Sequence, residues 1–211
     1  MKKKILITLF SILAIVAIIL LPIGISLATE RLTVCHSIPT KDQLKEGDII
    51  FNYSGSNQST LIAAGTQSYV THCGIIVFRN GKPMVYEAAR TVKLTPLKKF
   101  INRSRDGRFW IKRTNIPIRK IKTKYLDMPY DIQFKFNNGK MYCSELIYLV
   151  YKEQFGVELC KPKKVSDYLI LGSKHIPKLK KEIAKRGISM NQEAVAPVDI
   201  FNSPLLENID F

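Results

Sequence analysis

The sequence has few acidic side chains, few histidines and few cysteines. Its 211 residues include 17 Asp and Glu, 3 His and 4 Cys, together with 11 Gly and 10 Pro. These modest glycine, proline and cysteine contents exclude collagen-like, low-complexity and disulfide-dense small proteins. The sequence has no C-x-x-C pair and no Cys/His cluster at metal-ligand spacing, so we expect no metal and no cofactor. The hydrophobic share of 46% is that of an ordinary globular domain with its own core.

Basic residues, in contrast, are abundant. The 33 Lys and Arg give a formal net charge of +16, which predicts attraction to anionic surfaces. The most basic segment is 90–124, which contains Arg90, Lys93, Lys98, Lys99, Arg103, Arg105, Arg108, Lys112, Arg113, Arg119, Lys120, Lys122 and Lys124. This segment is either a solvated surface or a docking surface for an anionic membrane or wall polymer. No recognition motif or aromatic interleaving is present, so we expect no nucleic-acid partner.

The N-terminus has the layout of an export signal. Three lysines precede an uncharged stretch, residues 5–28, and Ser26-Leu27-Ala28 is a small-residue cleavage site at its end. The apolar centre is longer than most signals and approaches the length of a membrane span. We therefore expect residues 1–28 to be a signal peptide or a membrane anchor, followed by a stem (29–44) and one domain (45–211). The protein is expected in the cell envelope, either anchored by residues 5–27 or secreted after signal cleavage.

Turn signals and apolar runs predict an α+β fold. Asn80-Gly81 joins two apolar runs, 71–79 and 83–88, and Asn-Gly at such a junction is the strongest short-range signal of a β-hairpin. Further strands are expected at 49–51 and 108–114, and helices at 57–64, from Thr95-Pro96, at 142–155 and, as a basic exposed helix, at 174–186. A small antiparallel sheet with helices packed on it accounts for this order.

The hairpin brings a histidine and a carboxylate together. With a two-residue turn at Asn80-Gly81, Gly74 faces Glu87, and His72 lies on the same face as Gly74. Glu87 is then a diagonal neighbour of His72, within hydrogen-bond reach. A carboxylate in this position fixes the imidazole tautomer and favours its charged form. A cross-strand surface pair without any chemical role has the same pattern.

Cys143 is the candidate nucleophile. It falls in the first turn of the helix expected at 142–155, where the helix dipole and unpaired backbone N–H groups stabilise a thiolate. A neighbouring His would lower the pKa of the thiol further, and the same N–H groups can serve as part of an oxyanion site. A buried structural cysteine is the alternative, because the sequence gives no distance between His72 and Cys143.

The other three cysteines could take part in disulfides. Four cysteines in an exported protein allow three complete disulfide pairings. If Cys143 is a reactive free thiol, three cysteines remain and one of them cannot pair. Cys35 with Cys160 is the pair that conflicts least with this. Cys73 follows His72 directly, and its side chain is expected on the opposite face of the strand.

These residues belong to a longer set of fragments in a characteristic order. The fragments are Gly47-Asp48-Ile49-Ile50-Phe51, Thr71-His72-Cys73-Gly74-Ile75, Tyr86-Glu87-Ala88 with Thr95-Pro96-Leu97, Pro129-Tyr130-Asp131, Tyr142-Cys143-Ser144-Glu145-Leu146, and Pro197-Val198-Asp199-Ile200 with Ser203-Pro204. The set resembles the circularly permuted branch of the NlpC-type papain-like amidases, the YaeF/YiiX group, over nearly all of residues 45–205. In non-permuted relatives the Cys helix precedes the His strand. Here His72 and Glu87 precede Cys143, as the permuted branch requires.

The resemblance implies a permuted papain-like fold and a thiol hydrolase. Cys143 would be the nucleophile, His72 the general base, and Glu87 the residue that orients His72. The implied reaction is amide cleavage through an acyl-enzyme, on a cell-wall peptide or a lipid-derived acyl-amide. Two alternatives stay open: a lipid acyltransferase or thioesterase that uses the same Cys–His site, and a non-catalytic basic module that binds the anionic envelope surface.

Overall fold

The structure is a computed structural model that describes residue 30 and residues 33–35, 37–169 and 176–209. Residues 34–211 form one compact unit, which carries all the features discussed below. The apolar segment 5–27 and the expected cleavage site lie outside the described residues. Among the helices that are described, none is long and apolar enough to cross a membrane.

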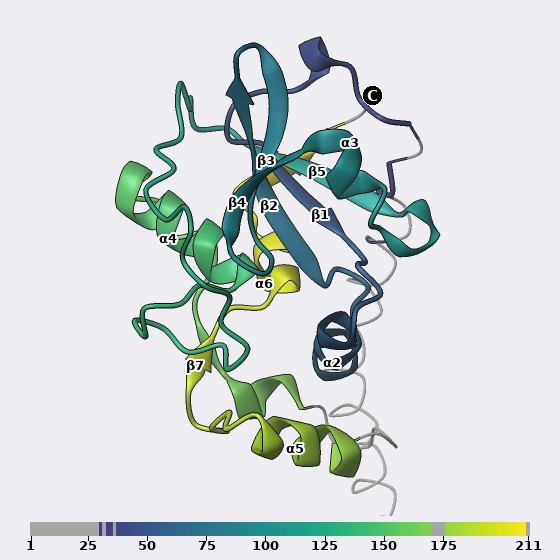
Figure 1. The fold of residues 1–211 in the computed structure, drawn as a ribbon, viewed down its shortest axis with the longest axis vertical. Coiled ribbons are helices and arrows are strands. Elements are labelled where there is room, and N and C mark those ends of the chain that lie inside the picture. The colour runs from purple at the N-terminus through teal and green to yellow at the C-terminus, as the bar shows by residue number, and fades with distance from the viewer. Residues whose placement is uncertain (1–29, 31–32, 36, 170–175, 210–211) are drawn as a thin grey trace, which may run out of the picture. The chain divides into compact units, whose positions relative to one another are not determined.

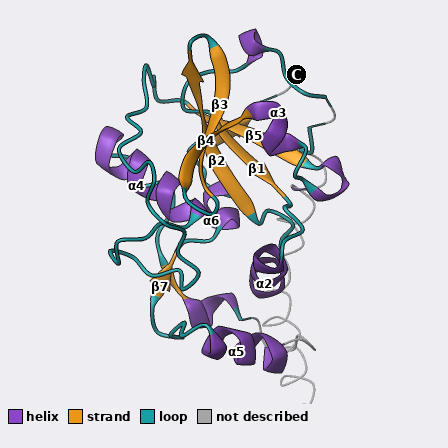
Figure 2. Ribbon diagram, in the orientation of Figure 1, coloured by secondary structure: helices purple, strands orange, loops and turns teal. Residues whose placement is uncertain are grey.

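The unit is built around one antiparallel sheet of six strands (Figures 1 and 2). The strand order is β4-β3-β2-β1-β5-β8. The strands are β1 (Ile49–Asn52), β2 (His72–Arg79), β3 (Lys82–Ala88), β4 (Val92–Pro96), β5 (Phe109–Thr114) and β8 (Leu206–Asn208). The predicted hairpin is confirmed, because Arg79 pairs with Lys82 and Ile75 pairs with Tyr86. Asn80 and Gly81 both have positive φ, as a type I′ turn requires.

Helices cover both faces of the sheet. On one face lie α4 (Cys143–Phe155) and α6 (Pro197–Phe201), packed on the larger hydrophobic cluster, and on the other lies α3 (Leu97–Ile101) with a smaller cluster. The helix predicted at 142–155 is thus confirmed, and it ends at Gly156, whose φ of 69° suits a left-handed cap. Strand residues alternate between the two clusters, so neighbouring side chains on β2 reach different faces.

A third cluster lies beyond the sheet and involves α2 (Asn57–Thr66) and α5 (Ile176–Lys185). The remaining short elements are η1 (Lys41–Gln43), η2 (Arg105–Gly107), η3 (Val165–Tyr168), β6 (Lys163–Lys164) and β7 (Glu193–Ala194). The sequence predicts a basic and exposed helix at 174–186. The helix in this segment, α5, is amphipathic instead. Its Leu179 and Ile183 are buried against Val165 and Leu61, because their spacing places them on one side of the helix.

Two other expectations need correction. The helix predicted to open at Thr95-Pro96 is present as α3, directly after the end of strand β4, but its N-cap is Pro96 and not Thr95. The Thr95 hydroxyl donates a hydrogen bond to Glu87 instead of capping α3. Cys35 and Cys160 are not joined by a disulfide. They pack on opposite faces of the sheet, Cys35 with the α3 cluster and Cys160 with the α4 cluster, so they do not pair.

Candidate active site

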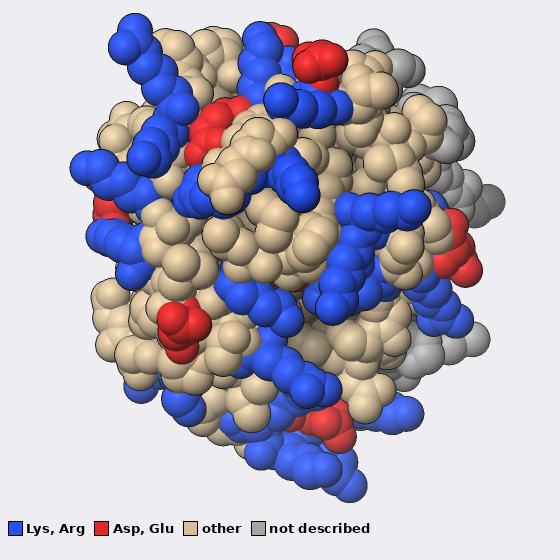
Figure 3. All heavy atoms as spheres, turned by 45° about the horizontal axis from the view of Figure 1, so that its top comes forward, with Lys and Arg blue, Asp and Glu red and all other residues tan. Residues whose placement is uncertain are grey.

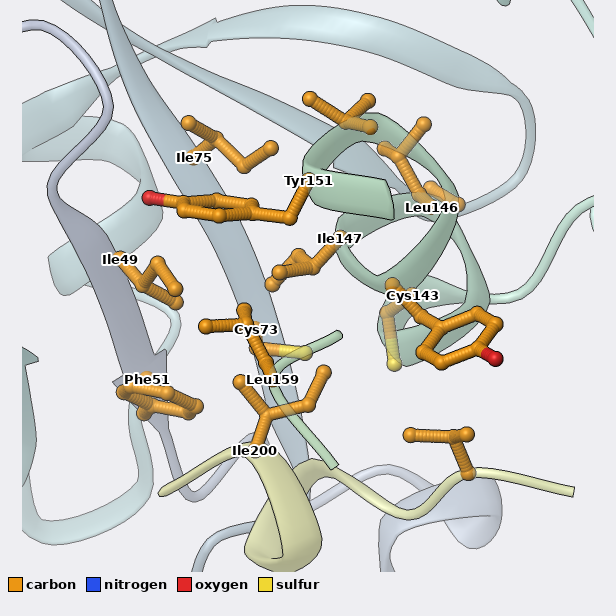
Figure 4. Packing of buried hydrophobic residues seen from close by; sticks show 14 of the residues in the cluster. Ile49, Phe51, Cys73, Ile75, Cys143, Leu146, Ile147, Tyr151, Leu159 and Ile200 are labelled. Carbon is orange, nitrogen blue, oxygen red and sulfur yellow. The ribbon is translucent and has the colours of Figure 1, made fainter. Parts of the chain in front are cut away.

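Cys143 is the first residue of α4 and is almost fully buried at the sheet. The chain enters the helix in extended conformation at Tyr142, and the Glu145 carboxylate accepts a hydrogen bond from the Tyr142 backbone N–H. Figure 4 shows Cys143 at the start of α4 and Cys73 on β2 near each other in the larger cluster, and the two thiols interact by a hydrogen bond. The first-turn N–H groups have no partners within the helix, so the thiol lies at the positive end of the helix dipole.

His72 begins β2 and is held from two sides. Its Nε2 atom lies 2.6 Å from Oε2 of Glu87, the diagonal neighbour that the hairpin register predicts. Its ring stacks on Phe100 of α3 at a centroid distance of 5.5 Å. The second carboxylate oxygen of Glu87 accepts hydrogen bonds from the Thr95 hydroxyl and from Arg103 Nη2, each at 2.5 Å. Glu87 is fully buried, and its partners fix both of its oxygens.

The charges of these groups depend on one another. Burial opposes a charged His72, but the neighbouring Cys143 thiolate and Glu87 carboxylate outweigh it and raise the pKa of His72 to about 9. Burial likewise opposes a charged Glu87, yet His72, Arg103 and Thr95 lower its pKa to about 2. The pKa of Cys143 is held well below its ordinary value by hydrogen bonding from the Cys73 thiol and by the charge of His72. The structure therefore brings together all three residues that the sequence singled out, as a thiolate, an imidazolium and a carboxylate.

Cys73 plays a part that sequence reasoning did not assign to it. Its side chain leaves β2 on the face opposite His72, as predicted, and that is the face on which α4 packs. Burial and the nearby Cys143 thiolate raise the pKa of Cys73 well above its usual range. Cys73 therefore stays protonated and acts as a hydrogen-bond donor to Cys143. Its position immediately after His72 was the only signal for this in the sequence.

Tyr130 is a second residue whose role was missed. A bridge pairs Tyr130 with Met141, two residues before the nucleophile. Burial, then the charge of Cys143 and a hydrogen bond with it, raise the pKa of the Tyr130 phenol well above its usual range. The phenol therefore remains a proton donor beside the thiolate. The sequence showed Pro129-Tyr130-Asp131 as a family fragment, but no periodicity pointed to this contact.

An apolar cavity of about 80 Å³ opens at the nucleophile. Besides Cys143 and Ser144, its wall consists of Leu61, Ile62, Gly65, Thr66, Phe134, Val165, Tyr168, Leu169, Leu179, Ile183, Ile188, Ala194, Val195, Ala196 and Pro197. The volume is several times the roughly 15 Å³ that one water molecule needs. A short alkyl group fits this space, and its burial there is favourable by about 0.8 kcal/mol per methylene.

A larger polar hollow of about 790 Å³ lies on the His72 side. Its wall contains Asn52, Ser54, Gly55, Ser56, Gln58, Ser59, Ile62, Thr71, His72, Ala89, Arg90, Arg103, Tyr130 and Ile132. The two spaces differ in character, because the wall of the first is almost wholly apolar and includes Cys143, whereas the wall of the second also has polar and charged side chains, His72 among them. The site can therefore hold a substrate with an apolar part and a polar part on the two sides of the reacting bond.

The described side chains of the site do not form a metal-binding donor set. Within the described part of the chain, no group of three or more His, Cys, Asp or Glu side chains is arranged to hold a metal ion. His72 is hydrogen-bonded to Glu87, and the other oxygen of Glu87 accepts from Arg103, so these residues do not make up a ligand set. We therefore derive no step of the reaction through a metal.

The arrangement of a thiol on a helix N-terminus against a strand histidine and its carboxylate is that of a cysteine hydrolase. The chain belongs to the permuted papain-like amidase family YaeF/YiiX, family C92 of the peptidases, whose sequence profile matches residues 43–210. Both the predicted family and the enzyme class, a cysteine amidase or peptidase, are thereby confirmed.

Two relatives show how far the similarity extends. The protein YiiX of Escherichia coli strain K12, described as uncharacterized, is 31% identical over an alignment of 175 residues, and the match covers 79% of this chain and 86% of that protein. The crystal structure of yiiX from Escherichia coli O157:H7, described as a metalloprotein, matches with a TM-score of 0.71 at 30% identity. That match covers 80% of this chain and 97% of the crystallised one. The metal belongs to the description of that protein, and the described residues here offer no equivalent cluster.

Proposed function

We propose that this chain hydrolyses an amide bond through a Cys143–His72–Glu87 triad, with an acyl-enzyme intermediate. The observation that carries the proposal is the coupled charge state of the site. His72 has a pKa of about 9 beside a thiol whose pKa is lowered, which is the condition for a reactive thiolate near neutral pH.

The reaction follows from the positions of these groups. The Cys143 thiolate attacks the carbonyl carbon, so that the Sγ–C bond forms while the C–N bond breaks. The imidazolium of His72 donates its proton to the departing nitrogen, which leaves as an amine. Neutral His72 then takes a proton from water, the resulting hydroxide equivalent attacks the thioester, and the acid product leaves with Cys143 restored. Glu87 holds the imidazole ring in position through its 2.6 Å contact throughout.

The oxyanion that forms during attack needs hydrogen-bond donors. Two sources lie beside Cys143: the backbone N–H groups of the first turn of α4 and the Tyr130 phenol. Donors that are already in place when the charge develops stabilise the transition state most effectively. We assign these groups to the oxyanion site.

The apolar cavity supports a second candidate function at the same site. A cavity that accepts an alkyl group beside Cys143 favours an acyl chain over a peptide side chain with polar groups. The thioester could then be transferred to an alcohol or amine instead of water, as in a lipid acyltransferase, or be formed from another thioester. Trapping with hydroxylamine distinguishes these cases, since it releases the acyl group as a hydroxamate whose chain length can be measured.

The test of the triad is the pH dependence of Cys143 alkylation by iodoacetamide. We expect the wild type to react near neutral pH as a thiolate, and His72→Ala to shift the profile toward the ordinary thiol value of about 8.5. Cys160 is the internal control, because burial raises its pKa to about 12 and it should remain unlabelled. An ordinary profile for Cys143 that is unchanged in His72→Ala would contradict the triad and favour the non-catalytic binding module.

We further propose that the enzyme works at an anionic membrane or wall surface of the cell envelope. Two kinds of observation support this, the basic and apolar layout of residues 1–28 and the excess of basic side chains in the domain. Figure 3 shows Lys and Arg side chains spread over one face with few acidic ones among them. Cell fractionation of the full chain, compared with a chain that lacks residues 1–28, tests the location directly.

The segment 90–124 contributes only part of this charge. Lys112 is buried and donates to the Phe201 carbonyl, and Arg113 pairs with Asp48. Pairing with carboxylates also engages Arg103, Arg108 and Lys124. The segment is therefore not one continuous docking surface, and binding to anionic vesicles should depend on its exposed members, such as Lys98, Lys99 and Arg119.

A further inference from the structure

We infer that the leaving group of the substrate carries an oxyanion, a carboxylate or a phosphate, which binds Arg90 and Arg103 in the polar hollow beside His72. The inference rests on the proposed function, because it takes His72 as the group that protonates the departing amine. It goes beyond that function by naming the chemistry of the leaving side of the substrate.

The charge of the hollow is the first argument. Its wall contains two arginines and His72 but no aspartate or glutamate. Within the site, Glu87 and the Cys143 thiolate offset two of these three positive charges, and one positive charge remains. An incoming anion would compensate it, whereas a cationic leaving group would be repelled.

Both arginines have guanidinium N–H groups that are available to a ligand. The Arg90 side chain is exposed, and no ion pair ties its guanidinium to any residue that the structure describes. Arg103 donates to Glu87 through Nη2 and lies over the Phe100 ring at 5.4 Å, which leaves its other N–H groups for a ligand. A guanidinium presents five N–H groups in a planar fork that matches both carboxylate and phosphate oxygens.

Another part of the wall of the hollow is also suited to an anion. It is formed by the N-terminal end of α2, where Ser56 caps the helix by accepting a hydrogen bond from the Ser59 N–H. The N–H groups of the two residues after the cap have no partner within the helix, and they lie at the positive end of its dipole. Anions bind at such helix ends.

A buried polar atom gives independent evidence that the hollow binds a ligand. Asn52 has no exposed surface, and its Oδ1 atom has no hydrogen-bond partner among the described residues, although its Nδ2 donates to the Phe100 carbonyl. The Nε2 atom of Gln58, a donor on a half-buried residue, is likewise buried and without a partner among the described residues. An unpaired buried acceptor is costly unless a ligand or water supplies the hydrogen, and the amine nitrogen of the leaving group carries one.

Alkylation of Cys143 by two reagents of different charge tests the inference without any substrate. Iodoacetate is an anion and iodoacetamide is its neutral counterpart, so the ratio of their rates reports how strongly the site attracts an anion. We expect Arg90→Gln to lower the iodoacetate rate by about threefold while the iodoacetamide rate is unchanged. The effect should disappear in 1 M salt, where the screening length is about 3 Å.

Arg119→Gln is the matched control, because Arg119 is an exposed arginine that does not line the hollow. It should leave both rates as in the wild type. Equal iodoacetate-to-iodoacetamide ratios in the wild type, Arg90→Gln and Arg119→Gln would overturn the inference. A charge-reversed Arg90→Glu should lower the ratio further than Arg90→Gln.

Hydrolysis of three hexanoyl amides then identifies the anion. The amines are ethylamine, glycine and O-phosphoethanolamine, which supply a neutral, a carboxylate and a phosphate leaving group. We expect kcat/KM to be highest for one of the two anions and the preference to be lost in Arg90→Gln. Equal kcat/KM for all three amides in both proteins would overturn the inference. Absence of hydrolysis together with a normal Arg90-dependent alkylation ratio would contradict the proposed function but support the anion site.

Discussion

His72 on strand β2 and Glu87 on strand β3 are bonded at 2.6 Å across the hairpin, and the second oxygen of the same carboxylate is held by Thr95 and Arg103. The carboxylate therefore has no freedom to turn away from the imidazole. The Cys143 thiolate and, after it, this fixed carboxylate stabilise the charged form of His72 against the effect of burial.

Removing the charge of Glu87 should lower the pH above which activity is lost. The ion pair of Cys143 and His72 exists only below the pKa of His72, so wild-type kcat/KM should fall as pH rises through about 9. Glu87→Gln keeps a similar shape but loses the negative charge, which lowers the pKa of His72. We expect the basic limb to move to lower pH and kcat/KM to fall by about tenfold or more. Glu153→Gln, at a surface pair with Lys124, is the control and should change neither.

Replacing Cys73 should make Cys143 less acidic. In Cys73→Ala the thiolate loses a hydrogen-bond donor while His72 remains, so its pKa should rise toward the ordinary thiol value without reaching it. The pH profile of Cys143 alkylation measures this shift. Cys160→Ala removes a thiol from the same core cluster and should leave the profile unchanged. Identical profiles for the two variants would show that Cys73 only fills space.

Tyr130→Phe should separate catalysis from thiolate formation. Loss of one oxyanion donor is expected to lower kcat by about tenfold to a hundredfold. Alkylation by iodoacetamide needs the thiolate but no oxyanion donor, so it should remain fast. Tyr125→Phe is a matched control, because its hydroxyl donates to Glu153 at the surface. A loss of kcat with an equally large loss of alkylation rate would instead indicate that Tyr130 organises the thiol.

Gly74→Ala should destabilise the hairpin that carries His72. A Cβ atom at Gly74 would lie 2.4 Å from Cγ1 of Val85 and 3.1 Å from the Tyr86 carbonyl oxygen. We expect a loss of about 1–3 kcal/mol in the free energy of unfolding, measured by denaturant titration. Adding Val85→Ala removes the closer contact, so the double variant should be more stable than the sum of the two single effects implies. Simple additivity would exclude this clash as the cause.

Glu145→Gln should change how stability depends on pH. Burial raises the pKa of Glu145 to about 8 from its ordinary value near 4.5. The folded state therefore holds the proton more tightly than the unfolded state, and stability is lost as pH rises from about 4.5 through about 8. The amide still accepts the hydrogen bond from Tyr142 but cannot ionise. The free energy of unfolding of the variant, relative to that of the wild type, should rise by on the order of 2 kcal/mol when the pH is raised from 5 to 8.

Thermal unfolding followed by circular dichroism at both pH values measures this difference. Glu207→Gln is the control, since Glu207 is exposed on the edge strand β8. Equal pH dependence of Tm in the wild type and Glu145→Gln would contradict the ionisation of Glu145 as its source.

Local rules were enough to predict much of the scaffold. Asn80-Gly81 determined the hairpin register, because a type I′ turn permits one pairing, and that register alone placed Glu87 beside His72. Gly156 marked the end of the Cys143 helix for an equally local reason, its ease in the left-handed conformation. The order of the fragments around His72, Glu87 and Cys143 identified the permuted family.

Other features depended on contacts between distant segments. The sequence did not show that β4 would pair with β3, which turned Thr95 from a helix cap into a partner of Glu87. It also did not show which face of β2 would receive α4, and that choice made Cys73 a neighbour of Cys143. The burial of the apolar side of α5 became clear only from its packing against α2.

The sequence by itself determined the residue types, their order and the spacing within each hairpin or helix, because turns and caps are decided by neighbouring residues. Only the tertiary structure decided the distances between His72, Cys143 and Tyr130, which come from separate elements. The same holds for the two spaces beside the reacting groups. Their walls are assembled from segments far apart in the chain, and the packing of those segments follows from burying one common core rather than from any local pattern.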